Sequence, residues 1–167
     1  IEGLLELFEA TFEKRWLETA AELNRAVIEH YWDDAGGGFF FTSADHEELL
    51  ARHKDARDGA VPSGNSVQLM NLLRLSVFLG DRKLHELADR TIAAFASQVQ
   101  ATPWSSERFL CAVDFARGGA VELAVVGDPA LPVTQALLSQ IYGTYLPNRV
   151  LVLHNPQRPH DSARSPL

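Results

Sequence analysis

The feature that most constrains the fold is an almost entirely apolar segment, residues 65–79, which directly follows a polar, turn-rich loop at 54–66. Gly59, Pro62 and Gly64 interrupt this loop, as expected for a fixed turn. A helix that is apolar on most sides is usually buried. Polar groups leading into it lie near the interior, where an unpaired polar group is costly. The pattern predicts either the floor of a ligand pocket or a rigid structural corner.

The composition fits one ordinary core, because the chain has 167 residues of which 46% are hydrophobic. Its formal net charge of −7 weighs against a nucleic-acid or anionic-membrane partner. The sequence shows no apolar run of membrane-spanning length and no signal-peptide pattern. We therefore expect a cytoplasmic protein. The chain opens at Ile1 and enters a helical pattern at once, so we also expect it to be part of something longer.

Two segments of the chain match each other in register, 4–20 and 72–88. Leu4-Leu-Glu-Leu7 aligns with Leu72-Leu-Arg-Leu75. Each copy predicts a helix, a short polar break and an amphipathic helix. In the second copy Gly80 suits a left-handed helix C-cap and Asp81 suits the N-cap of the next helix. Such self-similarity indicates repeated helical hairpins that bury their faces against neighbouring repeats.

The remaining elements follow from local patterns. Between the two copies, three glycines in 33–42 are expected to end a helix, and Phe39–Phe41 to form a brief strand or an extended crossing. A further helix is expected at 105–116. After Gly118-Gly119, the pattern predicts a strand at 121–126, a helix at 133–143 and a strand at 150–153, which together suggest a βαβ unit with parallel strands. The expected division is 1–118 for the helical hairpins, 119–154 for the βαβ unit and 155–167 for an unpacked tail.

Several short blocks, taken in order, point to a known family. They are Gly37-Gly-Phe-Phe, Arg52-His-Lys54, Asp58-Gly-Ala-Val-Pro-Ser-Gly-Asn-Ser66, Asn71-Leu-Leu-Arg-Leu75 with Gly80-Asp81, Val125-Val-Gly-Asp128 and Tyr145-Leu-Pro-Asn148. Over roughly residues 1–154 the chain resembles the C-terminal part of the YyaL-type, or spermatogenesis-associated, thioredoxin-domain family. The resemblance implies an N-terminal thioredoxin-like domain joined to a helical toroid similar to six-hairpin glycosidases and N-acylglucosamine 2-epimerases. It implies a mainly α fold here, a partial (α/α) toroid followed by a small βαβ unit.

The chain departs from the family pattern in what it lacks. The thioredoxin-like domain and most of the toroid's hairpins are absent from it, and the similarity fades after about Leu153. The implied partners are therefore the remaining hairpins and the thioredoxin-like domain of a parent protein. Thiol redox chemistry is not expected of this chain, because Cys111 is its only cysteine. Its apolar neighbours predict a buried, structural residue.

The 54–66 loop and its approach hold the candidate ligand-binding residues, which are Arg52, Lys54, Asp58, Ser63 and Asn65. In one interpretation they point into the toroid cavity and contact a sugar or another small polar ligand. In the other, Ser63 caps the buried helix while Asp58 and Asn65 satisfy backbone groups. The two interpretations differ in whether these side chains line an open cavity or are used in internal hydrogen bonds.

Catalysis is a further alternative, for which the sequence assigns no residue. A glycosidase needs two carboxylates flanking the scissile bond, and the candidates near the loop are Glu47, Glu48, Asp55 and Asp58. A sugar epimerase or isomerase needs two acid–base groups, for which His30, His46 and His53 are available.

No cofactor or metal is expected. The histidines form no HExxH motif, and neither a P-loop nor a G-x-G-x-x-G turn is present. Residues 126–129 are expected to form an ordinary turn, and the aromatic residues Trp32 and Phe39–Phe41 to pack in the core. The leading function is therefore a carbohydrate- or polyol-binding module. The alternatives are a non-catalytic structural platform for the thioredoxin-like domain and a sugar-modifying enzyme.

Overall fold

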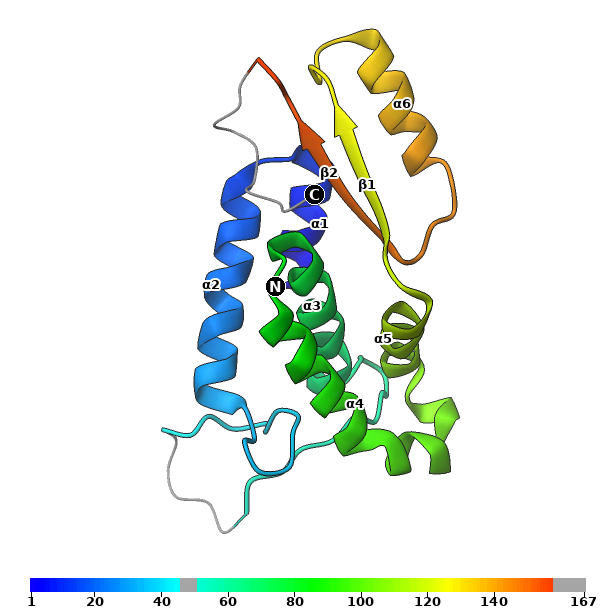
Figure 1. Ribbon diagram of the computed structural model, residues 1–167. Helices are drawn as coiled ribbons and strands as arrows, with labels where there is room; N and C mark the ends of the chain where they lie inside the picture. Colours follow the sequence, from blue (N-terminus) through cyan, green and yellow to red (C-terminus); the bar gives the residue numbers. More distant parts are fainter. Residues whose placement is uncertain (46–50, 158–167) are drawn as a thin grey trace.

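The computed structural model describes residues 1–45 and 51–157. The chain is mainly helical with a small two-stranded parallel sheet, which confirms the coarse fold prediction. Helices α3, α4 and α5 gather at one end, the sheet with α6 forms the other, and α1 lies beside β2 (Figure 1). The elements are α1 (Glu2–Thr11), α2 (Lys14–Tyr31), α3 (Gly64–Leu79), α4 (Arg82–Ala101), a 3₁₀ turn (Pro103–Ser105), α5 (Glu107–Gly118), β1 (Val121–Val126), α6 (Pro132–Tyr142) and β2 (Arg149–His154).

The two matching segments fold as the helix pairs α1–α2 and α3–α4. Ala20 and Ala88, which align in the sequence match, are both fully buried. The second pair shows the predicted caps: Gly80 is left-handed with φ 61°, and Asp81 Oδ1 accepts a hydrogen bond from Lys83 N at 2.9 Å. Two helix pairs do not make a ring, so the partial toroid stays a prediction.

Helix α3 lies at the centre of the core, as its composition predicts. Its Leu69, Leu72 and Leu75 are fully buried. It also buries polar side chains on the side facing α2. Gln68 Nε2 donates to Asn24 Oδ1 at 2.6 Å, and Asn71 Nδ2 donates to Gln68 Oε1 at 3.2 Å. These bonds compensate part of the cost of burying amides and join α2 to α3.

The glycine-rich segment after α2 differs from its prediction. The helix ends at Tyr31, before the glycines, and Trp32 is already extended. Gly37 and Gly38 instead form a tight turn against α4 with φ of 71° and 77°. A Cβ on Gly37 would lie 2.7 Å from Arg90 O, so only glycine fits there. Within the described residues, the Phe39–Phe41 run forms one antiparallel bridge, Phe39 with Trp32, in place of a strand.

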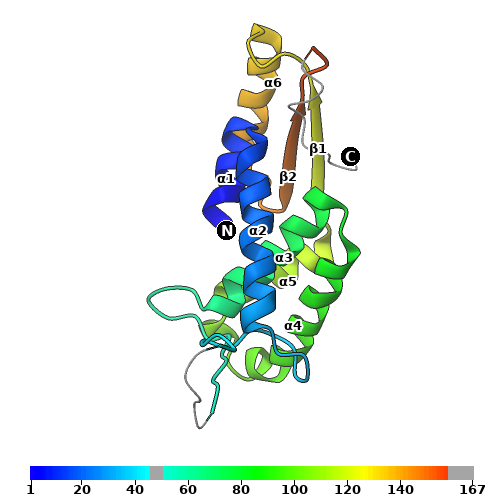
Figure 2. The ribbon, with the colours of Figure 1, turned by 90° about the vertical axis from the view of Figure 1, so that its left-hand side faces the viewer.

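The C-terminal unit is the predicted βαβ arrangement. Strands β1 and β2 pair in parallel, from Val121 with Arg149 to Val126 with His154. Helices α1 and α6 lie on the same side of the strands (Figure 2). Val150 and Val152 of β2 belong to the same hydrophobic core as the helices, so β2 is packed against the helical part. The proposed division at 118/119 stays a prediction, and most of the predicted tail, 158–167, lies outside the described residues.

Among the described residues, no helix combines the length and apolar character needed to cross a membrane.

Candidate functional site

Asn65, one of the five predicted site residues, is a buried link between two loops. Its Oδ1 accepts from Phe39 N at 2.7 Å, and its Nδ2 donates to Phe39 O and to Asp55 O, both at 2.9 Å. The side chain is only 3% exposed. Both ends of the amide are therefore used in holding the 39 and 55 segments to the start of α3.

Asp58 performs a similar task for α5. Its Oδ2 accepts from Arg108 N at 2.8 Å and from Phe109 N at 3.4 Å, which are free N–H groups of the first turn of that helix. Its Oδ1 accepts from Ser63 N at 2.8 Å. Ser63 in turn is the N-cap of α3, because its Oγ accepts from Ser66 N at 3.1 Å. The loop thus caps two helices at once.

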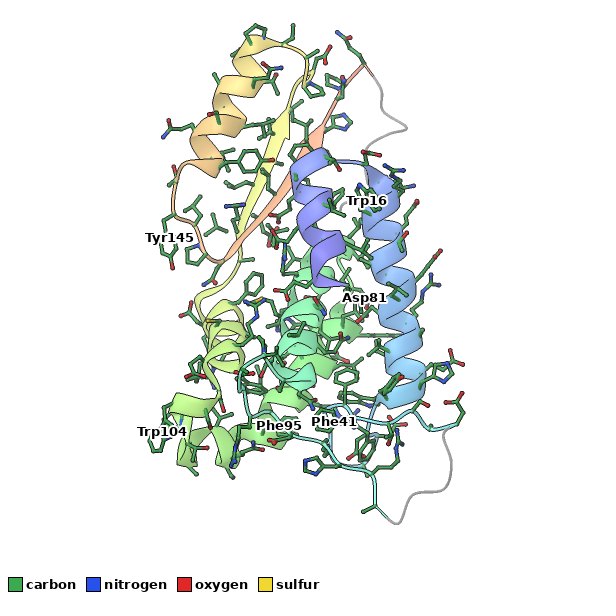
Figure 3. All side chains as sticks on the ribbon, turned by 180° about the vertical axis from the view of Figure 1, so that it is seen from behind. Trp16, Phe41, Asp81, Phe95, Trp104 and Tyr145 are labelled. Carbon is green, nitrogen blue, oxygen red and sulfur yellow. The ribbon has the colours of Figure 1, made fainter. Side chains whose placement is uncertain are left out.

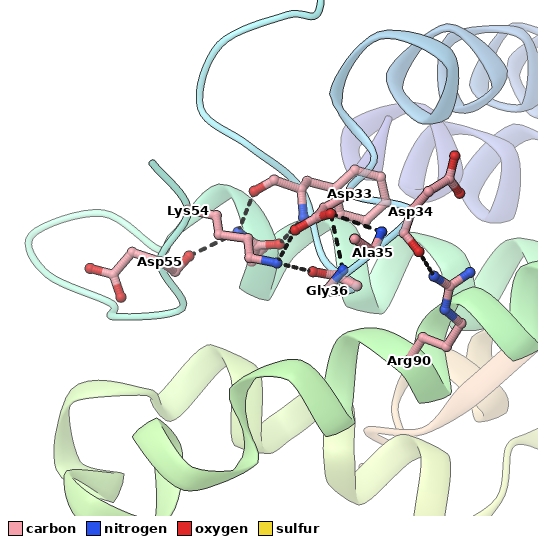
Figure 4. Close-up of polar contacts among 10 residues, drawn as sticks. Asp33, Asp34, Ala35, Gly36, Lys54, Asp55 and Arg90 are labelled. Atoms are coloured by element: carbon pink, nitrogen blue, oxygen red, sulfur yellow. Dashed lines mark hydrogen bonds and ion pairs between the residues drawn. The ribbon is translucent and has the colours of Figure 1, made fainter. Parts of the chain in front are cut away.

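Lys54 holds the glycine-rich turn in place through hydrogen bonds to Asp33 and Gly37 (Figure 4). Its Nζ donates to Asp33 Oδ2 and to Gly37 O, each at 2.5 Å. The hydrogen bond from Lys54, together with the N–H groups of Gly36 and Ala35, lowers the pKa of Asp33. Arg90 of α4 holds the same turn by donating to Asp34 O at 2.5 Å.

Arg52 is engaged with backbone and with an aromatic ring. Its Nη2 donates to Thr42 O at 2.5 Å and to His30 O at 3.3 Å. Its guanidinium carbon lies 4.1 Å from the centre of the Phe40 ring. All five predicted residues thus make internal contacts, the arrangement described above for a structural corner, and their ligand role stays an untested prediction.

The predicted catalytic candidates are dispersed. His46, Glu47 and Glu48 lie outside the described residues. His53 stacks on Phe41 with ring centres 5.6 Å apart, whereas His30 Nδ1 lies 3.8 Å from Asp45 Oδ1. Asp55 accepts a hydrogen bond from Gln98. The described residues therefore give these groups separate local partners.

A cleft of about 520 Å³ lies elsewhere, between α1, α3 and α5 on one side and the connection from α6 to β2 on the other. Figure 3 shows Tyr145 on that connection. The lining includes charged and aromatic side chains that come from segments far apart in the sequence. They are Glu2, Glu6, Glu9, Arg74, Arg108, Phe115, Tyr142, Tyr145 and Arg149.

Two of the three arginines in the cleft form hydrogen bonds with carboxylates of α1. Arg108 Nη2 bonds Glu2 Oε1. Arg74 Nη1 lies 2.5 Å from Glu6 Oε1, and its Nη2 lies 3.3 Å from Glu9 Oε1. Arg74 has a side chain only 7% exposed, and such a buried charge requires a partner. These pairs neutralise much of the acidic surface of α1.

Glu9 lies deepest in this charge cluster, with a side chain 4% exposed. Burial raises the pKa of Glu9, opposed by the Arg74 guanidinium and by the Leu151 N–H, which donates to Glu9 Oε1 at 3.2 Å. The Tyr142 hydroxyl donates to the Glu9 backbone oxygen at 2.6 Å. Burial, with the nearby Glu9 carboxylate, raises the pKa of Tyr142. Glu9 therefore joins α1 to both α6 and β2.

None of these cleft residues was among the predicted site residues. One signal was nevertheless present in the sequence: Arg74 interrupts the apolar pattern of 65–79. A charged residue on a buried helix is almost never found without a partner. The partner carboxylates, by contrast, belong to an ordinary acidic helix face and carry no comparable signal.

Cys111 corrects another prediction, because it is exposed. Helix α5 buries one face only, with Phe109, Ala112 and Phe115 turned to the core. Cys111 falls between these positions on the outer side, since a helix repeats every 3.6 residues. Its apolar sequence neighbours therefore did not indicate burial.

Comparison with known proteins adds what geometry alone cannot. The chain is 35% identical over 154 residues to spermatogenesis-associated protein 20 of Mus musculus, and 34% identical over 154 residues to that of Homo sapiens. The chain is thus similar to one part of spermatogenesis-associated protein 20. It is also 25% identical over 166 residues to an uncharacterized protein of Caenorhabditis elegans. No family model matches the chain.

The matches cover 92% of this chain but only 20% of each mammalian relative. The chain thus spans about a fifth of the length of the curated relatives it matches, and the worm protein is covered to 22%. The names of these relatives state no chemistry.

Proposed function

We propose that the chain is a carbohydrate- or polyol-binding module and that its binding site is the cleft between α1 and the connection from α6 to β2. The observation that carries this proposal is the cleft itself. Its volume of about 520 Å³ lies in the range of small-molecule sites, which combine apolar walls with a few polar groups. Carboxylates and guanidinium groups at its wall are suited to hydrogen-bond hydroxyl groups.

The aromatic residues supply the second requirement. Tyr145 is 87% exposed and Tyr142 is 42% exposed, and both line the cleft. A tyrosine ring presents an apolar face to the C–H groups of a sugar, while its hydroxyl remains a hydrogen-bonding group. An exposed aromatic residue beside a charged cavity is more useful for binding than for folding.

In the longer protein we place this module among the remaining hairpins of an (α/α) toroid, next to a thioredoxin-like domain, in the cytoplasm. The support for this is the resemblance described above and the similarity to part of spermatogenesis-associated protein 20. An epimerase or glycosidase activity stays a hypothesis from the sequence, without assigned catalytic residues.

A structural platform for the thioredoxin-like domain is the second candidate. It is supported by the 54–66 loop, where Asp58, Ser63 and Asn65 cap helices and join segments. The two functions are compatible, because the loop and the cleft use different residues.

Isothermal titration with a panel of neutral sugars, acidic sugars and polyols tests the binding proposal. We expect at least one to bind, and Tyr145→Ala to weaken it by about 5-fold, the effect of roughly 1 kcal/mol of lost stacking. Trp104→Ala is the matched control, because Trp104 is 72% exposed but does not line the cleft. Absence of binding by every neutral and acidic sugar, or equal effects of the two substitutions, would contradict the proposal.

A further inference from the structure

Arg149, the first residue of β2, differs from the other two arginines of the cleft. Its Nε lies 3.6 Å from Glu9 Oε2, too far for a hydrogen bond. That Nε is buried, and within the described part of the chain it has no hydrogen-bond partner. The side chain is only 25% exposed. One of the five donors of this guanidinium is therefore left without a hydrogen bond.

The other contacts of Glu9 explain why its carboxylate forms no hydrogen bond with Arg149. Glu9 Oε1 is shared by the Arg74 guanidinium and the Leu151 N–H. Burial also raises the pKa of Glu9, which makes its negative charge harder to keep. Arg149 instead lies over the ring of Tyr142, with its guanidinium carbon 5.6 Å from the ring centre.

The charge balance of the cleft points the same way. Glu2 and Glu6 are paired with Arg108 and Arg74. The remaining pair, Glu9 and Arg149, is long. A ligand entering the cleft thus meets neutralised carboxylates and one incompletely matched cation, although the chain as a whole carries a net charge of −7.

We propose that Arg149 anchors an anionic group of the ligand, a carboxylate or a phosphate, so that the cleft takes an acidic sugar or a sugar phosphate in preference to a neutral sugar. The sugar part of this inference rests on the proposed function. Guanidinium groups bind carboxylates and phosphates through two parallel hydrogen bonds, which gives direction as well as strength. The Tyr142 ring and the Glu9 carboxyl fix the guanidinium from the protein side.

The test is isothermal titration of the protein with glucose, glucuronate, glucose 6-phosphate and inorganic phosphate. We expect at least one acidic sugar to bind at least 10-fold more tightly than glucose, with affinity falling as salt is raised. Arg149→Gln should abolish this preference. Arg82→Gln is the matched control, because Arg82 is an arginine on α4, 90% exposed and outside the cleft, and it should leave the preference unchanged.

A second measurement on the unmodified protein covers the case in which Arg149→Gln does not fold. An arginine-selective dicarbonyl reagent, read by mass spectrometry, should modify Arg149, and glucuronate or glucose 6-phosphate should protect it while glucose does not. Arg149→Lys retains the charge but not the forked geometry, so it should lose most of the preference.

The outcomes separate the two proposals. Equal binding of glucose and both acidic sugars overturns the anion anchor and leaves the carbohydrate function intact. Binding of phosphate through Arg149 without binding of any sugar overturns the carbohydrate function and leaves the anion anchor. An acidic-sugar preference that survives Arg149→Gln overturns the role of Arg149. Absence of binding by all four compounds, with no protection of Arg149, overturns both.

Discussion

The 54–66 loop and the cleft both contain polar side chains beside the core, but the two regions use them differently. In the loop, Asn65 and Asp58 each spend both polar atoms on backbone partners. In the cleft, Arg149 Nε has no hydrogen-bond partner among the described residues, and Tyr145 is 87% exposed. The loop is the more distinctive of the two in sequence, yet the cleft has more polar and aromatic groups that a ligand could contact.

Polar residues beside a buried helix thus have two distinct uses. Where such residues are close in sequence, they readily satisfy nearby backbone groups and form a corner. Where they meet from distant segments, each is fixed by its own element, and full pairing is not guaranteed.

The largest effect is expected for Asn65→Ala. It leaves the buried N–H and C=O of Phe39 and the part-buried C=O of Asp55 without this partner. We expect a loss of about 3 kcal/mol in the free energy of unfolding, since an orphaned buried group costs about 1–3 kcal/mol. Urea denaturation measures it. Asn148→Ala, which removes an exposed bond to Asp114, should cost less than about 0.5 kcal/mol. Similar losses for both would show that the corner is not rigidly held.

A smaller loss is expected for Asp58→Ala. The substitution removes the acceptor for the first turn of α5 and for Ser63 N, so unfolding should become easier by about 1–2 kcal/mol, the usual value of a helix cap. Asp58→Asn keeps an acceptor oxygen and should lose less. If Asp58→Ala leaves stability unchanged but weakens sugar binding, the ligand-binding site lies at the 54–66 loop and not at the cleft.

A change in pH dependence is expected for Glu9→Gln. Burial holds the pKa of Glu9 above its ordinary value of 4.5, so the folded state binds this proton more tightly than the unfolded state. The stability contributed by this proton is complete below the unfolded pKa and is lost as pH rises through the folded pKa. Relative to Glu9→Gln, the natural protein should therefore lose stability over that rise. Denaturation at a series of pH values checks it, and parallel profiles would refute it.

The smallest effect on stability is expected for Tyr145→Ala. With a side chain 87% exposed, Tyr145 contributes little to the core, and its removal should change the free energy of unfolding by less than about 0.5 kcal/mol. Thermal and urea melts measure it. A loss of more than 1 kcal/mol would mean that the rim of the cleft, like the loop, is occupied in holding the fold together.

Much of the fold was predictable, because it depends on local signals. The apolar run predicted a buried helix at 65–79, and α3 spans Gly64–Leu79. Alternating and periodic residues predicted β1 at its observed bounds and α6 to within one residue. The glycine turn was misjudged for a physical reason: Gly37 and Gly38 are required by the close approach of α4, far along the sequence.

The cleft was beyond prediction because its pairs span the whole chain. Arg108 pairs with Glu2 across 106 positions, and Tyr142 reaches Glu9 across 133. No local pattern encodes such distances. Only Arg74, a charged residue in an apolar helix, indicated that a negatively charged partner was needed. The sequence did not show which residue that partner was. The burial of Cys111 was predicted wrongly for a simpler reason, because the sequence neighbours of a residue in a helix point in different directions.

The bond from Leu151 N to Glu9 Oε1 joins residues 142 positions apart, and this has a consequence for the order of folding. Closing so long a loop costs chain entropy before any contact repays it, and contacts of this kind slow folding. We expect α3 and α4 to form early from local contacts, and α1 to lock only when β2 arrives. Pulsed hydrogen exchange during refolding should therefore protect amides of α1 and β2 together and later than those of α3, and ribosome-bound chains truncated before Arg149 should leave α1 open to proteases.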